Sequence, residues 1–186
     1  MTQSRIDKAL EVAAIVHEGQ ARKGTDIPYI IHPVGVMLGA SKVTGDEDTL
    51  VACLLHDVLE DGDPDVYSVD DMLRDFGPKV TAIVKAVTKD ESISDWRTRN
   101  EDYLRNLAKC QNRASYIVSA ADKIHNLRSI LVDHEQVGEV LWSRFNAGKD
   151  AQKWWYHATL ALFEEKIPGN PLARELAELV TLLDKL

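Results

Sequence analysis

The sequence has few cysteines and no long apolar run. Its two cysteines, Cys53 and Cys110, are too few for a disulfide framework or a thiolate zinc site. The N-terminus lacks the apolar core of a signal peptide, and no segment approaches the roughly 18 unbroken apolar residues that a membrane span requires. We therefore expect a protein without membrane segments, in the reducing environment of the cytoplasm.

Positive charge is also scarce. The chain has 22 Lys and Arg residues against 30 Asp and Glu residues, which gives a formal net charge of −8. This balance argues against nucleic-acid binding, because a nucleic-acid binder needs a basic face that neutralises phosphates. A phosphorylated small molecule is compatible with the charge, since a metal ion and a few local cations can reverse the field inside a cleft.

The sequence has no two-residue alternation long enough to indicate a β-sheet. Apolar residues instead repeat at three- and four-residue steps nearly throughout the chain. Together with the capping residues, these repeats predict helices near residues 6–19, 33–40, 46–62, 68–77, 78–87, 95–109, 116–132, 135–146, 150–166 and 171–186. The length of 186 residues favours a single all-α domain, residues 1–186, of about eight to ten helices.

A run of charges interrupts the apolar stretch 54–62. On a continuous helix Glu60 would lie one turn beyond His56 and Asp61 one turn beyond Asp57, so that all four would share one side. Three acids and an imidazole in apolar surroundings are costly unless a positive group lies among them. A divalent cation is the obvious candidate for that group.

Two other segments supply further ligands. Asp122 lies within an apolar helical run, and His32 stands beside a proline at the start of a predicted helix. Each residue alone is more simply interpreted as structural, but the combination favours a metal site formed by His32, His56, Asp57 and Asp122. Two imidazoles and two carboxylates suit a first-row divalent ion such as Mn²⁺, Fe²⁺ or Zn²⁺. Four protein ligands would leave one or two positions for water and substrate, as hydrolysis requires.

At these residues the chain resembles the HD-domain phosphohydrolases, and more specifically the hydrolase domain of the RelA/SpoT homologues and their stand-alone small alarmone hydrolases. The matching blocks are AIVHEGQ (14–20), RKGTDIPYIIHP (22–33), LVACLLHDVLED (50–61), VTK (87–89) and ADKIHNLRS (121–129). The resemblance implies an HD-domain helical bundle. It also implies Mn²⁺-dependent removal of the 3′-pyrophosphate from guanosine tetra- and pentaphosphate, the alarmones of the stringent response.

The resemblance also implies roles for single residues. It aligns four residues with the family's metal ligands: His32, His56, Asp57 and Asp122. It aligns Glu60 and Asp61 with the acid pair that handles the attacking water. Four positions align with substrate contacts: Arg22 and Lys23 with the nucleotide, and Asn126 and Ser129 with the sugar–phosphate region. Tyr29 is a further candidate, for stacking on the base.

Two other functions remain open at this point. The same metal site would serve a phosphohydrolase that acts on another nucleotide, such as a nucleoside monophosphate or the 2′-phosphate of NADPH. A non-enzymatic nucleotide-binding module is the other alternative, although a binder has no need of the water-handling acids Glu60 and Asp61. We interpret His17 and His125 as structural. The sequence leaves open the identity of the metal and whether the chain forms a homo-oligomer.

Overall fold

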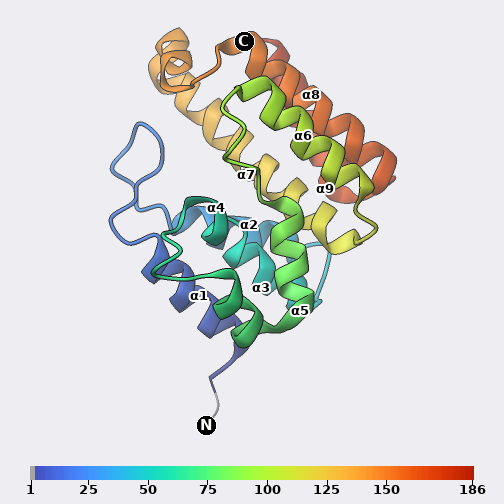
Figure 1. The fold of residues 1–186 in the computed structure, drawn as a ribbon. Coiled ribbons are helices and arrows are strands. Elements are labelled where there is room, and N and C mark those ends of the chain that lie inside the picture. Colours follow the sequence, from blue (N-terminus) through green and yellow to red (C-terminus); the bar gives the residue numbers. More distant parts are fainter. Residues whose placement is uncertain (1–2) are drawn as a thin grey trace.

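The computed structural model describes residues 3–186 as helices joined by loops (Figure 1). The elements are α1 (Arg5–Val16), α2 (Ile31–Ala40), α3 (Glu47–Leu55), α4 (Val58–Asp61), α5 (Val69–Val87), α6 (Trp96–Lys109), α7 (Arg113–Val137), the 3-10 helix η1 (Gly138–Arg144), α8 (Lys149–Lys166) and α9 (Pro171–Asp184). Within residues 3–186 there is no strand, only an isolated bridge between Ala21 and Pro28. The predicted all-α fold and helix number are confirmed. None of the described helices is long and apolar enough to cross a membrane.

Helix α7 is the central element of the bundle. It packs against α2, α3 and α5 on one side and against α8 and α9 on the other (Figure 1), and η1, which follows it directly, contacts it as well. Every residue from Ser115 to Ile124 is buried, so this stretch has no solvent-facing stripe. A helix enclosed in this way is expected to be apolar all round. The two charged residues within the enclosed stretch, Asp122 and Lys123, are therefore exceptions that need a partner.

At α3 and α5, side-chain caps begin the helices where the sequence predicts them. Asp46 accepts a hydrogen bond from the backbone N–H of Thr49 at the start of α3, and Ser68 forms a capping box with Asp71 at the start of α5. Gly77 lies inside α5 with a φ of 83°, which the absence of a side chain makes accessible. This kink separates α5 into the two predicted segments, 68–77 and 78–87.

The prediction of one continuous helix over residues 46–62 is wrong. Helix α3 ends at Leu55, and the short α4 begins at Val58, with His56 and Asp57 in the turn between them. Consecutive residues of a continuous helix point about 100° apart. The break allows His56 and Asp57 to direct their side chains at a common point.

The predicted helix over residues 135–146 is also wrong. Helix α7 continues to Val137, where Gly138 ends it with a φ of 62°, and η1 follows as a 3-10 helix. Residue Glu135 lies inside α7 and begins no new helix. A smaller difference concerns α2, which begins at Ile31 rather than at Pro33.

Helices α2 and α7 approach each other closely at Gly35. A Cβ atom on Gly35 would lie 2.3 Å from Cδ2 and Nε2 of the His125 ring on α7. We expect Gly35→Ala to displace this ring and to lower the free energy of unfolding by about 1–3 kcal/mol. Urea denaturation measures the change. Gly45→Ala is the matched control, because a Cβ there meets nothing within 4 Å, and equal losses in the two variants would contradict the prediction.

Candidate active site

Four polar side chains from α2, the α3–α4 turn and α7 converge inside the bundle. The Nε2 atom of His56 lies 3.0 Å from Oδ2 of Asp57 and 3.7 Å from Oδ1 of Asp122. The Nε2 atom of His32 lies 3.4 Å and 3.2 Å from the same two oxygens. Both histidines and Asp122 are buried. The structure thus brings together all four residues that the sequence predicts as metal ligands.

The histidine rings are held by their other nitrogens. Nδ1 of His56 lies 2.9 Å from the carbonyl oxygen of Cys53, to which it donates, so its Nε2 keeps a lone pair when the ring is neutral. Nδ1 of His32 lies 2.9 Å from Nδ1 of His125. Burial and the neighbouring His32 and Arg22 lower the pKa of His125 to about 4, so His125 is neutral. A neutral His125 can accept the proton of His32 Nδ1, which leaves Nε2 of His32 free to bind a cation.

The charges in the cluster depend strongly on one another. Burial acts to raise the pKa of Asp57, but the adjacent His56 and His32 hold it well below its usual range. Burial acts to lower the pKa of His56, but Asp57 and Asp122 hold it well above its usual value. The carboxylates are therefore stable here only because positive charge lies among them. Protonated imidazole supplies that charge, and a divalent cation would supply it equally well.

The donor set fits a divalent metal ion. The Nε2 atom of His56 is buried and makes no hydrogen bond, although carboxylate oxygens surround it. His32, His56 and Asp57 each offer one ligand atom, and these atoms lie within 4.8 Å of one another. Two imidazole nitrogens with carboxylate oxygens suit a first-row divalent ion better than Ca²⁺ or Mg²⁺, which prefer oxygen alone.

Neighbouring residues on α7 fix the orientation of Asp122. Lys123 forms a buried ion pair with Oδ2 of Asp122. The side-chain amide of Asn126 donates to Oδ1 of Asp122 at 2.5 Å, and its carbonyl oxygen accepts from Nη2 of Arg22 at 2.7 Å. A chain of hydrogen bonds therefore connects Arg22, in the loop between α1 and α2, with an acid of the central cluster.

The acid pair lies beside the cluster, at the end of α4. Glu60 accepts a hydrogen bond from the backbone N–H of Lys89 at 3.0 Å, and Nζ of Lys89 is 3.7 Å from its other oxygen. Partial burial and the charges of Asp57 and Glu60 raise the pKa of Asp61 to about 6. Both acids line a polar cavity of about 120 Å³ whose wall also includes Asp57 and Asp122. Asp61 is thus suited to exchange a proton near neutral pH.

A larger cavity of about 640 Å³ adjoins the small one, since both are lined by Tyr29, Lys89, Lys123 and Asn126. All five residues that the sequence suggests for substrate contacts line the larger cavity: Arg22, Lys23, Tyr29, Asn126 and Ser129. Its wall also includes four aromatic side chains: Trp96, Phe145, Trp155 and Tyr156. The volume is in the range of small-molecule sites.

Sequence reasoning did not identify three residues of this site. His125, interpreted as structural, contacts His32, and Lys123 and Lys89 separate the two cavities. The i, i+3 spacing of Asp122 and His125 on α7 is a local signal that would have placed His125 on the same helix face. Lys89 follows α5 and comes near Glu60 only through the packing of α4 on α5, so its role has no local signal.

Comparison with known proteins identifies the family of this arrangement. A family model described as an HD domain matches residues 9–149, about three quarters of the chain. The chain belongs to the HD domain family. The four converging side chains all lie within the matched residues of this HD domain.

The relatives of this HD domain include enzymes of guanosine polyphosphate metabolism. It is 37% identical over 129 residues to the guanosine-3′,5′-bis(diphosphate) 3′-pyrophosphohydrolase MESH1 of Drosophila melanogaster, covering 68% of this chain and 69% of that protein. It is 35% identical over 131 residues to a GTP pyrophosphokinase of Streptomyces coelicolor, covering 69% of this chain. The match spans only 15% of the Streptomyces protein.

A solved structure shares the whole fold. It is that of a metazoan orthologue of SpoT, a protein described as hydrolysing ppGpp and acting in starvation responses. The superposition has a TM-score of 0.78 at 27% sequence identity, and it covers 100% of this chain and 99% of that one. The similarity therefore extends beyond the matched sequence blocks to the C-terminal helices α8 and α9.

Proposed function

We propose that this HD domain hydrolyses guanosine 3′,5′-bis(diphosphate), that is, guanosine tetraphosphate, at the 3′ position and releases pyrophosphate and GDP. Guanosine pentaphosphate would be hydrolysed in the same way to pyrophosphate and GTP. One observation carries the proposal: a cluster of two histidines and two acids opens into a small acidic cavity, which adjoins a larger cavity lined by cations and aromatic rings. The first compartment suits water and a phosphoryl group, and the second suits a nucleoside.

The metal in this proposal is held by His32, His56, Asp57 and Asp122. We propose Mn²⁺ as the working ion, because the nitrogen and oxygen donor set suits a first-row divalent cation. When bound, such an ion supplies Lewis-acid activation of water and of the phosphoryl group. His125 and Asn126 orient two of the ligands, His32 and Asp122, before the ion binds.

The acid pair handles the proton of the attacking water. Asp61 takes this proton as general base, and Glu60 lies beside it, held by the backbone of Lys89. The water oxygen forms a bond to the phosphorus that carries the 3′ oxygen of the ribose. The bond between that phosphorus and the 3′ oxygen breaks, the 3′ oxygen takes up a proton from solvent, and pyrophosphate is released; Asp61 then returns its proton to solvent.

Cations on the shared wall of the two cavities offset the negative charge of the pyrophosphate group under attack. Lys89 lies above the rings of Tyr103 and Trp155, with Nζ 5.9 Å and 5.7 Å from their centroids, and it is only loosely paired with Glu60. Lys123 is already paired with Asp122. Lys89 is therefore the cation that is available to a phosphate oxygen of the substrate.

We expect Lys89→Met to lower kcat/KM by about 10- to 100-fold, which corresponds to the loss of one hydrogen bond to a charged group. Steady-state kinetics with guanosine tetraphosphate measure the effect. Lys85→Met is the matched control, because Lys85 is an exposed lysine near the end of α5 and lines neither of the two cavities. Equal kinetics for Lys89→Met and wild type would remove Lys89 from phosphate binding.

The function itself is tested by incubating the protein with Mn²⁺ and guanosine tetraphosphate and following pyrophosphate and GDP by ion-exchange chromatography. We expect turnover that stops when a chelator is added. NADPH and nucleoside monophosphates serve as comparison substrates in the same assay. The proposal fails if the metal-loaded protein leaves guanosine tetraphosphate intact, or if one of the comparison substrates has the higher kcat/KM.

A further inference from the structure

The hydroxyl of Tyr29 lies between an acid of the metal cluster and an acid of the catalytic pair. Its oxygen is 2.6 Å from Oδ2 of Asp57 and 3.3 Å from Oδ2 of Asp61. Burial, and then the charge of Asp57, raise the pKa of Tyr29 far above its usual value. The phenol therefore stays protonated and donates its single proton, chiefly to the nearer acid, Asp57.

The oxygen that accepts this hydrogen bond is the one that faces the histidines. Oδ2 of Asp57 lies 3.0 Å from Nε2 of His56 and 3.4 Å from Nε2 of His32. A carboxylate oxygen has two lone pairs, so it can accept from Tyr29 with one and bind a cation with the other. The hydrogen bond from Tyr29 thus determines which lone pair of Asp57 points into the cluster.

From this geometry we propose that Tyr29 is a positioning residue, whose hydroxyl locks Asp57 in its metal-binding orientation and keeps Asp61 next to it. The inference rests on the proposed metal-dependent hydrolysis. It differs from the base-stacking role suggested by the sequence, because the proposed role depends on the hydrogen bonds of the hydroxyl and not on the ring. Without this donor the two carboxylates would face each other unscreened, and repulsion would separate them.

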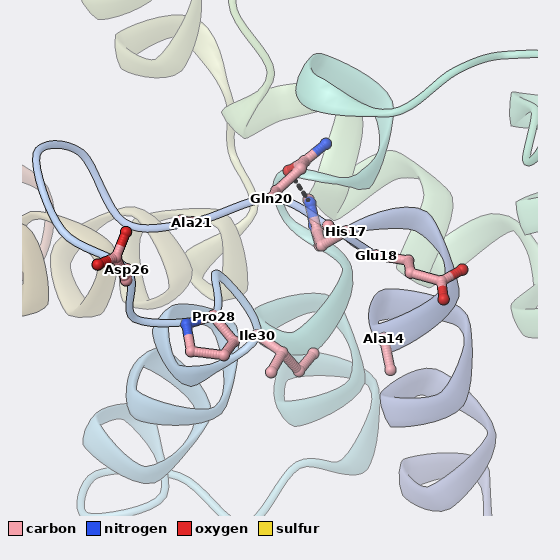
Figure 2. A pocket seen from close by; sticks show the side chains of 9 residues that line it. Ala14, His17, Glu18, Gln20, Ala21, Asp26, Pro28 and Ile30 are labelled. Atoms are coloured by element: carbon pink, nitrogen blue, oxygen red, sulfur yellow. Dashed lines mark hydrogen bonds between the residues drawn. The ribbon is translucent and has the colours of Figure 1, made fainter.

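The loop that carries Tyr29 is itself tied to Asp61. The backbone N–H of Tyr29 donates to the carbonyl oxygen of Gln20 at 2.9 Å, and the Tyr29 ring lies 4.7 Å from the ring of His17. The side chain of Gln20 accepts from Nδ1 of His17, as Figure 2 shows, and donates to the backbone carbonyl of Asp61 at 3.1 Å. Through these contacts, His17 and Gln20 connect Tyr29 to the end of α4 and fix their relative positions.

Tyr29→Phe tests the proposal, because it removes the hydroxyl and keeps the ring. We expect the Kd for Mn²⁺, measured by isothermal titration calorimetry, to rise by about 10- to 100-fold, as for other losses of a hydrogen bond to a metal ligand. We also expect kcat to fall at saturating Mn²⁺, with little change in KM. Tyr67→Phe is the matched control, because the Tyr67 hydroxyl also bonds a carboxylate, Asp75, at 3.3 Å outside the site.

The outcomes separate this proposal from its alternatives. An unchanged Kd for Mn²⁺ in Tyr29→Phe would overturn it, as would an equal rise of the Kd in Tyr67→Phe. If the ring alone mattered, Tyr29→Phe would behave as wild type and Tyr29→Leu would raise KM. The Mn²⁺ titration needs no substrate, so it decides the role of Tyr29 even if guanosine tetraphosphate is not the substrate. Urea denaturation in chelator checks that Tyr29→Phe is folded. Gln20→Ala removes the side-chain hydrogen bonds of Gln20 to His17 and Asp61, and we expect it to lower kcat as well.

Discussion

Asp61→Asn is expected to lower kcat by about 10²- to 10⁴-fold, the usual contribution of a general base, while Mn²⁺ still binds. Asparagine has nearly the same shape as aspartate but cannot take a proton from water. The carboxylates that lie within 3.7 Å of His32 and His56 are those of Asp57 and Asp122, not that of Asp61, so the Kd for Mn²⁺ should stay close to that of wild type. Steady-state kinetics and calorimetry measure the two quantities. Asp65→Asn, on the exposed loop after α4, is the control.

The pH dependence gives a second measurement of the same role. The pKa of Asp61 is raised to about 6, and only the ionised carboxylate accepts a proton. Activity of the wild type is therefore expected to fall as the pH decreases through this value. The residual activity of Asp61→Asn should not show this decrease, the acidic limb of the pH–activity profile. If the limb persists in Asp61→Asn, the group that titrates is not Asp61, and Glu60 becomes the candidate base.

Asp122→Ala is expected to abolish both Mn²⁺ binding and hydrolysis, and also to destabilise the fold. Asp122 is the buried partner of Lys123, which is itself only 6% exposed. Removing one member of a buried ion pair costs about 3–5 kcal/mol, because the remaining charge stays uncompensated. Urea denaturation in the presence of chelator measures this loss without any contribution from bound metal.

A double variant separates the two roles of Asp122. In Asp122→Ala/Lys123→Met the unpaired ammonium is gone, so we expect most of the lost stability to return. Mn²⁺ binding and activity should stay absent, because the carboxylate of Asp122 is still missing. Recovery of Mn²⁺ binding in the double variant would show that Asp122 is not a ligand. Failure to recover stability would show that Lys123 is not the source of the loss.

Most of the central cluster can be predicted from the sequence, because three of its four members lie in apolar helical runs where polar residues are unusual. His56 and Asp57 stand out as polar residues in an apolar stretch, and so does Asp122 in α7. Their position among apolar residues requires a compensating charge, and this requirement is the signal that relates these two distant segments to each other. The helix caps are similarly local, since Asp46 and Ser68 each bond a backbone N–H three residues away.

The parts that the sequence does not predict depend on tertiary packing. The helix break at His56 and Asp57 contains no glycine or proline, so the sequence carries no local signal for it. The place of Lys89 beside Glu60 depends on how α4 packs on α5. The Tyr29 hydroxyl reaches Asp57 across 28 residues of sequence, and no spacing rule relates positions in a loop and a turn.

The hydrogen-bond chain from Arg22 through Asn126 to Asp122 has a thermodynamic consequence. A ligand that binds the Arg22 guanidinium removes the donor that Arg22 gives to the side-chain carbonyl of Asn126. Because the amide of Asn126 donates to Asp122, the electrostatic field at the Asp122 carboxylate changes as well. In the proposed function Arg22 binds the nucleotide and Asp122 the ion, so this path would link nucleotide affinity to metal affinity. Linkage is reciprocal, so whatever factor the ion adds to nucleotide binding, the nucleotide adds to ion binding. With Arg22 at the nucleotide and Asp122 at the ion, as we propose, the substrate-free and the substrate-bound protein would differ in their affinity for the ion.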